Sequence, residues 1–534
     1  MSLAGRRVRS REPSGALPTI LREPLKWRDV RVRELVRAEW APMVGVLVLG
    51  AVVRVWAINS LGFNTDEAVY AGQAAAIAQD PELKDIFPIF RAHPLLFQFF
   101  LALLFSFGTI DLLGRLAGVA VGLATVFLAY KLGELLYGRR TGLVAALLLA
   151  LMPYHVIVTR QVLLDGPMAL FATLTLYLLA RFAQTQAPVW LYAAGAGMGL
   201  TFLSKETGII LLSGIYGFLA LSPEIKVRIR DLAIAMASMA IVIAPFPLSL
   251  MLAGGRGSQT TGEYLVWQLF RRPNHEFTFY PTVVPPALGL LVIGAAVLGL
   301  VFVWRQQTWR EKLLISWILV PTLFFQIWPV KGFQYLIAVA PPLAILAAQA
   351  ISRFNPQIVR GFGWEMDTPW MRPLLTLIVA LSLAIPTIGV IQPSSSSQFL
   401  AGTGGVPGGR EAGRWIEANT PEGSRLLTIG PSMANILQFY GHRRAYGLAV
   451  SPNPLHRNPS YEPLDNPDLL IRNNELQYVV WDSFSAARSS FFSDGVMRYV
   501  NRYHGRAVHT ETVVVSTPSG DVNKPVIIVY EVRP

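Results

Sequence analysis

The stretch RLAGVAVGLATVFLAYKLGELLYGRR (residues 115–140) decides the fold class of this chain. Its apolar run approaches the ~20 residues that cross about 30 Å of bilayer hydrocarbon. The run ends at the basic pair Arg139-Arg140, and a second apolar run over 141–158 follows directly. Two apolar runs joined by a short basic turn are typical of a transmembrane helical hairpin whose turn lies on the cytoplasmic side.

The composition of the 534-residue chain fits a membrane protein throughout. Hydrophobic residues make up 53% and charged residues 15%, with a mean hydropathy of +0.44. Soluble chains carry roughly a quarter charged residues. The net charge of +13 comes from basic residues that recur between apolar blocks. This distribution indicates orientation by cytoplasmic loops and argues against nucleic-acid binding. The absence of cysteine excludes disulfides, thiolate zinc sites and cysteine nucleophiles.

Eleven apolar segments are predicted to cross the membrane. The stretch 93–112 is also apolar, but if it crossed, Arg139 and Arg140 would fall outside. The charge bias therefore predicts one long outer loop over 59–113 that contains juxtamembrane helices. Residues 1–40 are predicted to be a basic cytoplasmic tail with an interfacial helix over 26–39. The predicted spans are 41–58, 114–136, 141–158, 166–183, 188–204, 206–222, 231–252, 283–304, 312–330, 333–351 and 371–391.

The C-terminal part of the chain changes character. A Ser/Gly/Pro-rich linker over 392–409 follows the last span. Residues 410–534 are predicted to form an α/β domain, which an odd number of spans places outside, opposite the cytoplasmic N-terminus. The predicted helices are GREAGRWIEANTPEG (409–423) and GVMRYVNRYHG (495–505), and the predicted strands are LLTIG (426–430), QYVVW (477–481), HTETVVV (509–515) and PVIIVYEV (525–532).

Ionisable residues gather at the outer ends of the predicted spans. Charges at membrane depth are costly, so such residues are functional candidates. The cations among them run against the positive-inside bias, as expected of a site that holds a phosphate. These residues are Asp66, Glu67, Arg91, His93, Arg115, Arg160, Asp165, Lys205, Glu206, Arg256, Arg271, Arg272, His275, Glu276 and Lys331.

The segment NTDEAVYAGQAAAIAQD (64–80) predicts a helix that begins with two acids. Its Asn-Thr start can cap the helix, and carboxylates in a first turn are favoured by the helix dipole. Asp66 and Tyr70 share one face, whereas Glu67 points elsewhere. One interpretation is an ordinary acidic first turn on a surface helix. The functional interpretation is that Asp66 acts as a general base at the membrane boundary.

A second acid lies in RQVLLDGPMALF (160–171). Asp165, shortly before Pro167, fits the cap of a helix start. The alternative is that Asp165 faces Asp66 across an outer vestibule, where it holds a metal or orients the acceptor.

The segment PVKGFQYLIAVAPPLAIL (329–346) joins two predicted spans. Tyr335 is typical of an interface anchor. Lys331 is the better candidate for pairing with a lipid phosphate.

Several motifs occur in an order that resembles one superfamily of membrane enzymes. They are DEAVY (66–70), His93-Pro94-Leu95, the stretch 115–140, the stretch 160–171, GAGMGLTFLSKETGIILL (195–212), EYLVWQLFRRPNHEFTFYPTVVPP (263–286) and GFQYLIAVAPPLAIL (332–346). Together they resemble the GT-C glycosyltransferases, within them the protein O-mannosyltransferase and aminoarabinose transferase-like group (families 39 and 83). The resemblance covers roughly residues 41–350. It implies a mainly α, polytopic GT-C fold.

The resemblance implies a polyprenyl-phosphate-sugar donor, used on the non-cytoplasmic face of the cell membrane. The acceptor is a protein, a lipid or a cell-envelope glycan. Asp66 matches the acid taken as catalytic base, and Asp165 matches the second acid. The candidate catalytic residues are Asp66, Glu67 and Asp165, and the candidate donor-phosphate residues are Arg91, His93, Arg115, Arg160, Lys205, Arg271, Lys331 and Tyr335. A divalent metal stays open as a cofactor, with Glu67, Asp165 and His275 as candidate ligands, although His275 is more typical of a solvated loop.

Two departures from the family pattern concern the donor phosphate. His93 replaces a lysine that some relatives carry before the proline. Gln334-Tyr335 stands where some relatives have an arginine–tyrosine pair. Because the arginine is missing, Lys331 is expected to supply the positive charge at this place.

The chemistry needs a base and a phosphate clamp. An acceptor hydroxyl loses a proton to a carboxylate as it attacks the anomeric carbon. Cations stabilise the leaving phosphate, and a single displacement inverts the anomeric centre. The alternative is a transporter or flippase, but such proteins usually show repeated halves with binding residues at the bilayer midplane.

Overall fold

The computed structural model describes residues 40–254, 262–264, 266–271, 273–302, 308–354, 370–392, 405–517 and 520–534. The predicted basic tail and interfacial helix, Arg256, Arg272 and most of the predicted linker lie outside these ranges. By their contacts, Met43–Pro534 form one compact unit.

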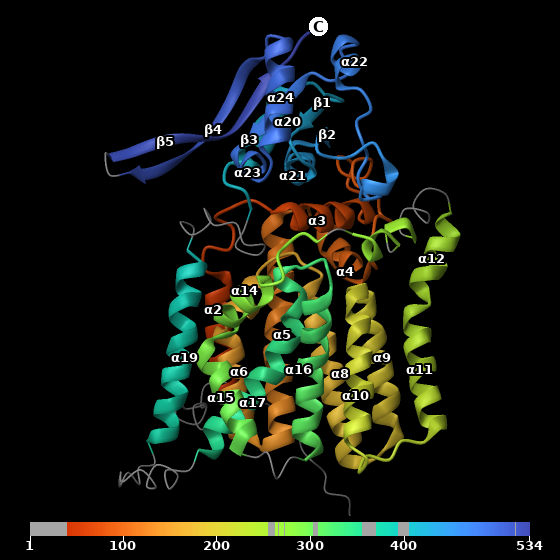
Figure 1. Cartoon of the computed structure of the whole chain (residues 1–534), viewed down its shortest axis with the longest axis vertical. Coiled ribbons are helices and arrows are strands. Elements are labelled where there is room, and N and C mark those ends of the chain that lie inside the picture. The colour runs from red at the N-terminus through yellow and green to blue at the C-terminus, as the bar shows by residue number, and fades with distance from the viewer. Residues whose placement is uncertain are drawn as a thin grey trace, which may run out of the picture. The chain divides into compact units, whose positions relative to one another are not determined.

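The described chain is mainly helical, with several apolar helices. Five helical segments are long and apolar enough to cross a membrane, and up to seven if each of two bent pairs counts as one span. Figure 1 labels many of these helices. Outside the outer loop and the C-terminal residues, the helices are α2 (Ala41–Val55), α5 (Asp111–Tyr137), α6 (Arg139–Leu151), α7 (Pro153–Thr159), α8 (Asp165–Thr185), α9 (Pro188–Ser204), η1 (Glu206–Ile210), α10 (Leu211–Leu221), α11 (Ile229–Ile243), α12 (Pro245–Ala253), α14 (Phe279–Leu288), α15 (Leu290–Phe302), α16 (Trp309–Ile327), η3 (Phe333–Val339), α17 (Ala340–Arg353) and α19 (Met371–Val390).

The hairpin of α5 and α6 is close-packed because glycines face each other. A Cβ on Gly142 would lie 2.5 Å from the Tyr130 carbonyl oxygen, and one on Gly133 would lie 2.9 Å from the Gly142 Cα. Small residues allow such close backbone approach between membrane helices. The turn itself contains Gly138, whose φ of 94° favours glycine.

A break between α6 and α7 directs the chain toward the region of Asp165. The two helices are bent by 64°, and Pro153 opens α7 without an N–H to donate. The carbonyls left without helical partners accept other donors. Ala150 accepts 2.9 Å from Arg54 Nη1, and Leu151 accepts 2.7 Å from Thr387 Oγ1.

The predicted outer loop contains two helices that lie across one end of the bundle, α3 (Thr65–Ile77) and α4 (Leu96–Phe105) (Figure 1). At 1.5 Å per residue, α4 is about 15 Å long and cannot cross the hydrocarbon. Asn64 caps α3, and its amide group and the Glu67 carboxylate form a reciprocal capping box.

The C-terminal residues carry a five-stranded sheet in the order β2-β1-β3-β5-β4. β1 runs parallel to β2 and β3, whereas β5 is antiparallel to β3 and β4. The elements are α20 (Gly409–Asn419), β1 (Arg425–Thr428), α21 (Pro431–Gly441), β2 (Arg444–Gly447), η5 (Pro454–His456), α22 (Pro467–Arg472), β3 (Tyr478–Asp482), α23 (Ser483–Arg488), α24 (Ser490–Arg502), β4 (Arg506–Thr517) and β5 (Gly520–Glu531).

Candidate active site

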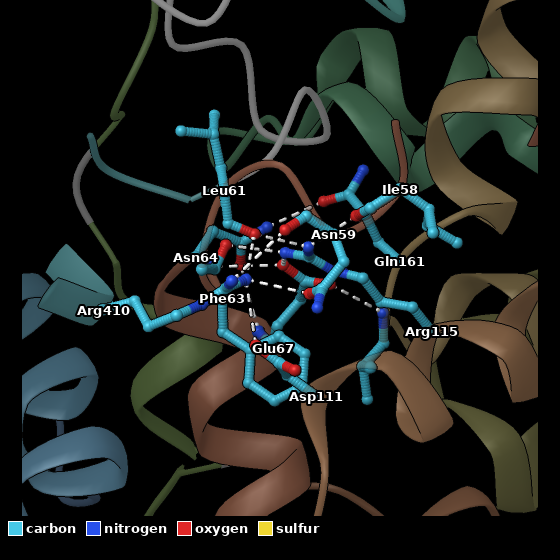
Figure 2. Close-up of polar contacts among 12 residues, drawn as sticks. Ile58, Asn59, Leu61, Phe63, Asn64, Glu67, Asp111, Arg115, Gln161 and Arg410 are labelled. Carbon is cyan, nitrogen blue, oxygen red and sulfur yellow. Dashed lines mark hydrogen bonds and ion pairs between the residues drawn. The ribbon is translucent and has the colours of Figure 1, made fainter. Parts of the chain in front are cut away.

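A buried clamp fixes the chain that leads into α3. Arg115, on α5, uses all five of its N–H groups (Figure 2). Two of them go to Glu67, at 2.9 and 2.8 Å, and the other three go to main-chain carbonyls between Ile58 and Gly62. Arg115 is 2% exposed and Glu67 is fully buried. Arg115 therefore has no N–H left for a lipid phosphate, contrary to its predicted role.

Glu67 is likewise saturated. Besides Arg115, its carboxylate accepts from the main-chain N–H groups of Asn64 at 3.0 Å and Val162 at 3.2 Å. Four donors occupy the two oxygens, so neither a proton nor a metal ion finds a vacant lone pair without breaking this network. The geometry gives Glu67 a positioning function instead of the predicted catalytic one.

A second clamp joins the same loop to the C-terminal residues. Arg410, on α20, pairs with Asp111 at 2.9 Å and donates to the Leu61 carbonyl at 2.6 Å. Tyr440, on α21, accepts 2.7 Å from the Phe63 N–H and donates to Asp111 at 3.1 Å. Side chains from α5 and from the C-terminal helices α20 and α21 thus hold the segment that leads into α3; Figure 2 labels Arg115, Asp111 and Arg410 among them.

Asp66 lies beside this network but is not part of it. Its side chain is partly exposed and makes no hydrogen bond or ion pair with any residue that the structure describes. Partial burial raises the pKa of Asp66; the positive charges of Lys205 and His93 oppose this rise, and the negative charge of Asp165 adds to it. Asp66 is thus a carboxylate with open acceptor sites among ionisable neighbours.

Asp165 and Lys205 form a buried ion pair next to Asp66. Asp165 opens α8 and Lys205 follows α9, so the α8–α9 hairpin brings the two residues to the same end. The Lys205 Nζ lies 2.8 Å from both Asp165 oxygens and 4.7 Å from the centre of the Tyr335 ring. Two of its three N–H groups are thereby used, and the third has no hydrogen-bond acceptor among the described residues.

A second pair, His93 and Glu206, lies near enough to Asp66 for the charge of His93 to act on it. The His93 Nδ1 lies 2.7 Å from a Glu206 carboxylate oxygen. The imidazole is also edge-on to the rings of Tyr70 and Tyr264, at 5.9 and 5.3 Å between centroids. The site is therefore lined by an Asp–Lys ion pair, a His–Glu pair and phenols.

Three predicted phosphate-binding residues differ in their availability. Arg271 stacks over Trp267 at 4.8 Å, and no carboxylate partner is described for it. Arg160 donates to the Trp56 carbonyl at 2.6 Å. The charges that act on Arg160 are those of Arg115 and Glu67, not that of Asp66. Arg91 lies over the ring of Tyr461 at 5.0 Å, next to C-terminal residues.

Lys331 is engaged elsewhere. Its ammonium donates to the carbonyls of Phe325, Gln326 and Trp328, at 3.4, 2.8 and 3.2 Å. These carbonyls end α16, where a cation is favoured by the helix dipole. Lys331 is a helix cap, so the predicted phosphate contact is not what the structure shows.

The three candidate metal ligands are not gathered together. Glu67 and Asp165 are each occupied by an ion pair, and His275 stacks on Phe279 at 4.1 Å. In the described part of the chain, the His/Asp/Glu group with separations suited to a metal ion is Glu82, Glu417 and His442, which includes none of those candidates.

Tyr264, Tyr461 and Asn435 were not predicted from the sequence. Tyr264 lies in a segment that was identified only as an outer loop. Tyr461 and Asn435 approach Arg91 from more than 340 positions away, which no local motif can signal. Tyr70 was predicted to share a face with Asp66, and the charge of Asp66 acts on it.

Known proteins resemble this chain both in sequence and in structure. Residues 92–250 match the family described as dolichyl-phosphate-mannose-protein mannosyltransferase. The undecaprenyl phosphate-alpha-4-amino-4-deoxy-L-arabinose arabinosyl transferase of Pectobacterium carotovorum is 28% identical over 307 residues, which cover 52% of each protein. The chain therefore spans about half the length of the curated relatives it matches.

Solved structures extend the likeness over nearly the whole chain. ArnT from Cupriavidus metallidurans in the apo state has a TM-score of 0.68 at 15% identity, over 91% of this chain and 97% of ArnT. ArnT bound to undecaprenyl phosphate has a TM-score of 0.65 at 16% identity, over 92% and 98%. The resemblance indicated by the motifs is thereby confirmed: this chain is similar in sequence to the mannosyltransferase family over residues 92–250 and to the arabinosyl transferases, and it has the fold of ArnT.

Proposed function

We propose that the chain is an integral membrane glycosyltransferase that moves a sugar from a polyprenyl-phosphate donor to an extracytoplasmic acceptor. The observation that carries this proposal is the Asp66 carboxylate, without a hydrogen bond to any described residue, beside the Asp165–Lys205 and His93–Glu206 pairs. A base and a set of cations in one place are what displacement of a lipid phosphate requires.

Each group has a distinct role in the proposed reaction. Asp66 takes the proton of the acceptor hydroxyl as that oxygen attacks the anomeric carbon. Lys205, with one N–H to spare, and Arg271 hold the leaving phosphate, and His93 donates to it when its ring carries the proton. Asp165 keeps Lys205 in position. One displacement with no covalent enzyme intermediate inverts the anomeric centre.

The donor class follows from the relatives. The curated relatives are named as arabinosyl transferases that use an undecaprenyl phosphate sugar, and ArnT has been solved with undecaprenyl phosphate. A polyprenyl phosphate also suits a site whose cations lie at one end of an apolar helix bundle. The acceptor is a protein, a lipid or a cell-envelope glycan.

The proposed topology places this chemistry outside the cell membrane. Eleven spans within 41–391 put the N-terminus in the cytoplasm and the outer loop 59–113 on the opposite face. After a linker over 392–409, residues 410–534 form an extracytoplasmic α/β domain. The contacts of Arg410 and Tyr440 with the outer loop support one shared side for the loop and this domain.

Turnover by the purified chain tests the proposal. Wild-type protein in detergent, supplied with undecaprenyl-phosphate sugars and cell-envelope acceptors, should transfer the sugar. Asp66→Asn should lower kcat about 10²–10⁴-fold, the usual contribution of a positioned base. Asp494→Asn, an exposed carboxylate on α24, is the matched control and should keep full activity. Movement of intact donor across vesicles without sugar transfer would instead identify a flippase.

A further inference from the structure

A cavity lies between the stretch that follows α3 and the C-terminal residues. Its volume is about 200 Å³. One wall comes from residues 84–91, and the other from α21, β2 and the segment 460–462. Its polar lining includes Lys84, Arg91, Asn435, Arg444, Tyr461 and Glu462.

Two buried donors line this cavity without adequate acceptors. Arg91 is 8% exposed, and no carboxylate lies within ion-pair distance of it among the described residues. Its described side-chain hydrogen bond is a long one, 3.5 Å to Asn435 Oδ1. Asn435 is 2% exposed, and its Nδ2 makes no hydrogen bond of normal distance and angle, although the amide lies near enough to the Tyr461 phenol to oppose the rise that burial causes in the pKa of that group. The Glu462 carboxylate lines the same cavity and acts on Arg91 from beyond ion-pair distance. A buried cation without a close anion is costly, and so is a poorly paired buried amide. Both costs are relieved if an anion binds between them.

The cavity adjoins the candidate active site on the side away from the helix bundle. Tyr461, which covers Arg91, also feels the charges of Asp66 and Arg271. α21 packs on α3, beyond the helix bundle in Figure 1. A lipid-linked donor must approach from the bundle, where Lys205 lies. A group that enters past α21 reaches Asp66 from the opposite direction, as an acceptor would.

We propose that this cavity is an acceptor subsite that binds an oxyanion, a phosphate or carboxylate of the acceptor, through the Arg91 guanidinium and the Asn435 amide. The inference rests on the proposed function. It moves Arg91 from the donor phosphate to the acceptor, and it makes the C-terminal residues a part of substrate recognition.

Inorganic phosphate is a suitable probe for the anion site. The thermal unfolding midpoint of the purified full chain in detergent should rise saturably with phosphate at constant ionic strength. Asn435→Asp places a carboxylate beside Arg91, which pairs that cation and repels an anion, without a change of shape. We expect Asn435→Asp to weaken phosphate binding about tenfold or more, with an unchanged or higher midpoint in the absence of phosphate. Arg425→Gln removes a partly exposed cation on β1 that pairs with Glu475; it is the control and should bind phosphate as wild type does.

A second measurement separates the two sites. Binding of undecaprenyl phosphate should persist in Asn435→Asp and Arg91→Gln and be lost in Lys205→Met. Equal loss of undecaprenyl phosphate in Arg91→Gln and Lys205→Met would overturn the inference, because Arg91 would then serve the donor. Phosphate binding that is indifferent to Asn435→Asp would overturn it as well. Phosphate binding that depends on Asn435, in a protein without any sugar transfer, would support the anion site and reject the glycosyltransferase proposal.

Discussion

Asp66 and Glu67 are adjacent in sequence but differ in burial and in hydrogen bonding. Glu67 is fully buried and accepts four hydrogen bonds, whereas Asp66 is partly exposed and accepts none from the described residues. On a helix, successive side chains point about 100° apart, so two neighbouring acids face different surroundings. The two acids therefore divide the work: Glu67 holds the loop and Asp66 is available to react.

The pH dependence of sugar transfer should follow the protonation state of the Asp66 carboxyl. Partial burial raises the pKa of its carboxyl above the ordinary value of about 3.9. A base works only when it is deprotonated, so kcat/KM should fall as the pH drops through this raised pKa. A carboxyl with a raised folded-state pKa is stabilising when protonated, and that stability is lost as the pH rises through the same value. Asp66→Asn should thus match or exceed wild type in thermal stability at neutral pH.

The measurement is a pH profile of kcat/KM together with thermal unfolding at each pH. The acid limb should disappear from the residual activity of Asp66→Asn and persist in His93→Asn. If the acid limb instead persists in Asp66→Asn and disappears in His93→Asn, the imidazole and not the carboxylate controls the rate.

At the scale of elements, the loop between α2 and α3 has almost no regular structure of its own. Arg115 supplies what the backbone lacks, because it satisfies carbonyls that would otherwise be buried without donors. A buried charge pair is a weak stabiliser as a whole, but removal of one partner leaves the other buried and unpaired.

Glu67→Gln should therefore destabilise the protein by about 3–5 kcal/mol, and Arg115→Gln by at least as much. Because both residues act in one network, the double variant should lose clearly less than the sum of the single variants. Thermal unfolding of the four proteins in detergent gives this cycle. Additive losses would mean that the pair does not act as a unit.

Several elements were predictable from the sequence, because apolar periodicity and length are local properties. The predicted strands LLTIG, QYVVW, HTETVVV and PVIIVYEV overlap β1, β3, β4 and β5, with different ends. β2 was missed because it has only four residues, including a charged one and a glycine. α21 was missed because it lies between short strands and has no side-chain cap.

The candidate site was predictable only in part. Motif order placed Asp66, Asp165 and Lys205 among the functional candidates, and the structure sets these three side by side. The partners of Arg115 and Lys331 could not be predicted, because a cation's partners are set by tertiary contacts. Arg115 binds a loop more than 50 positions away, and Lys331 folds back onto the helix before it.

At the scale of the whole molecule, the candidate site is built from two regions that are far apart in sequence. The described C-terminal residues do not merely cover the outer loop. Tyr440 binds the Phe63 N–H at the entrance of α3, and Asp111 at the start of α5 binds both Tyr440 and Arg410. We therefore expect the orientation of Asp66 to depend on Tyr440, a side chain 374 positions later.

Tyr440→Phe tests this dependence because it removes the hydroxyl and leaves the ring packing. The Phe63 N–H and the Asp111 carboxylate each lose a buried partner, which costs about 1–3 kcal/mol per group. We expect hydrogen exchange over the segment before α3 to speed up about tenfold or more, since 1.4 kcal/mol is tenfold in an opening equilibrium. Exchange in the α5–α6 hairpin should not change.

Sugar transfer by Tyr440→Phe should fall while its affinity for undecaprenyl phosphate stays at the wild-type value, because the variant loosens the base and not the donor cations. Tyr530→Phe, on β5 and remote from the loop, is the matched control for loss of a phenol oxygen. If exchange before α3 is the same in Tyr440→Phe and Tyr530→Phe, the C-terminal residues do not position Asp66, and the site belongs to the helical region alone.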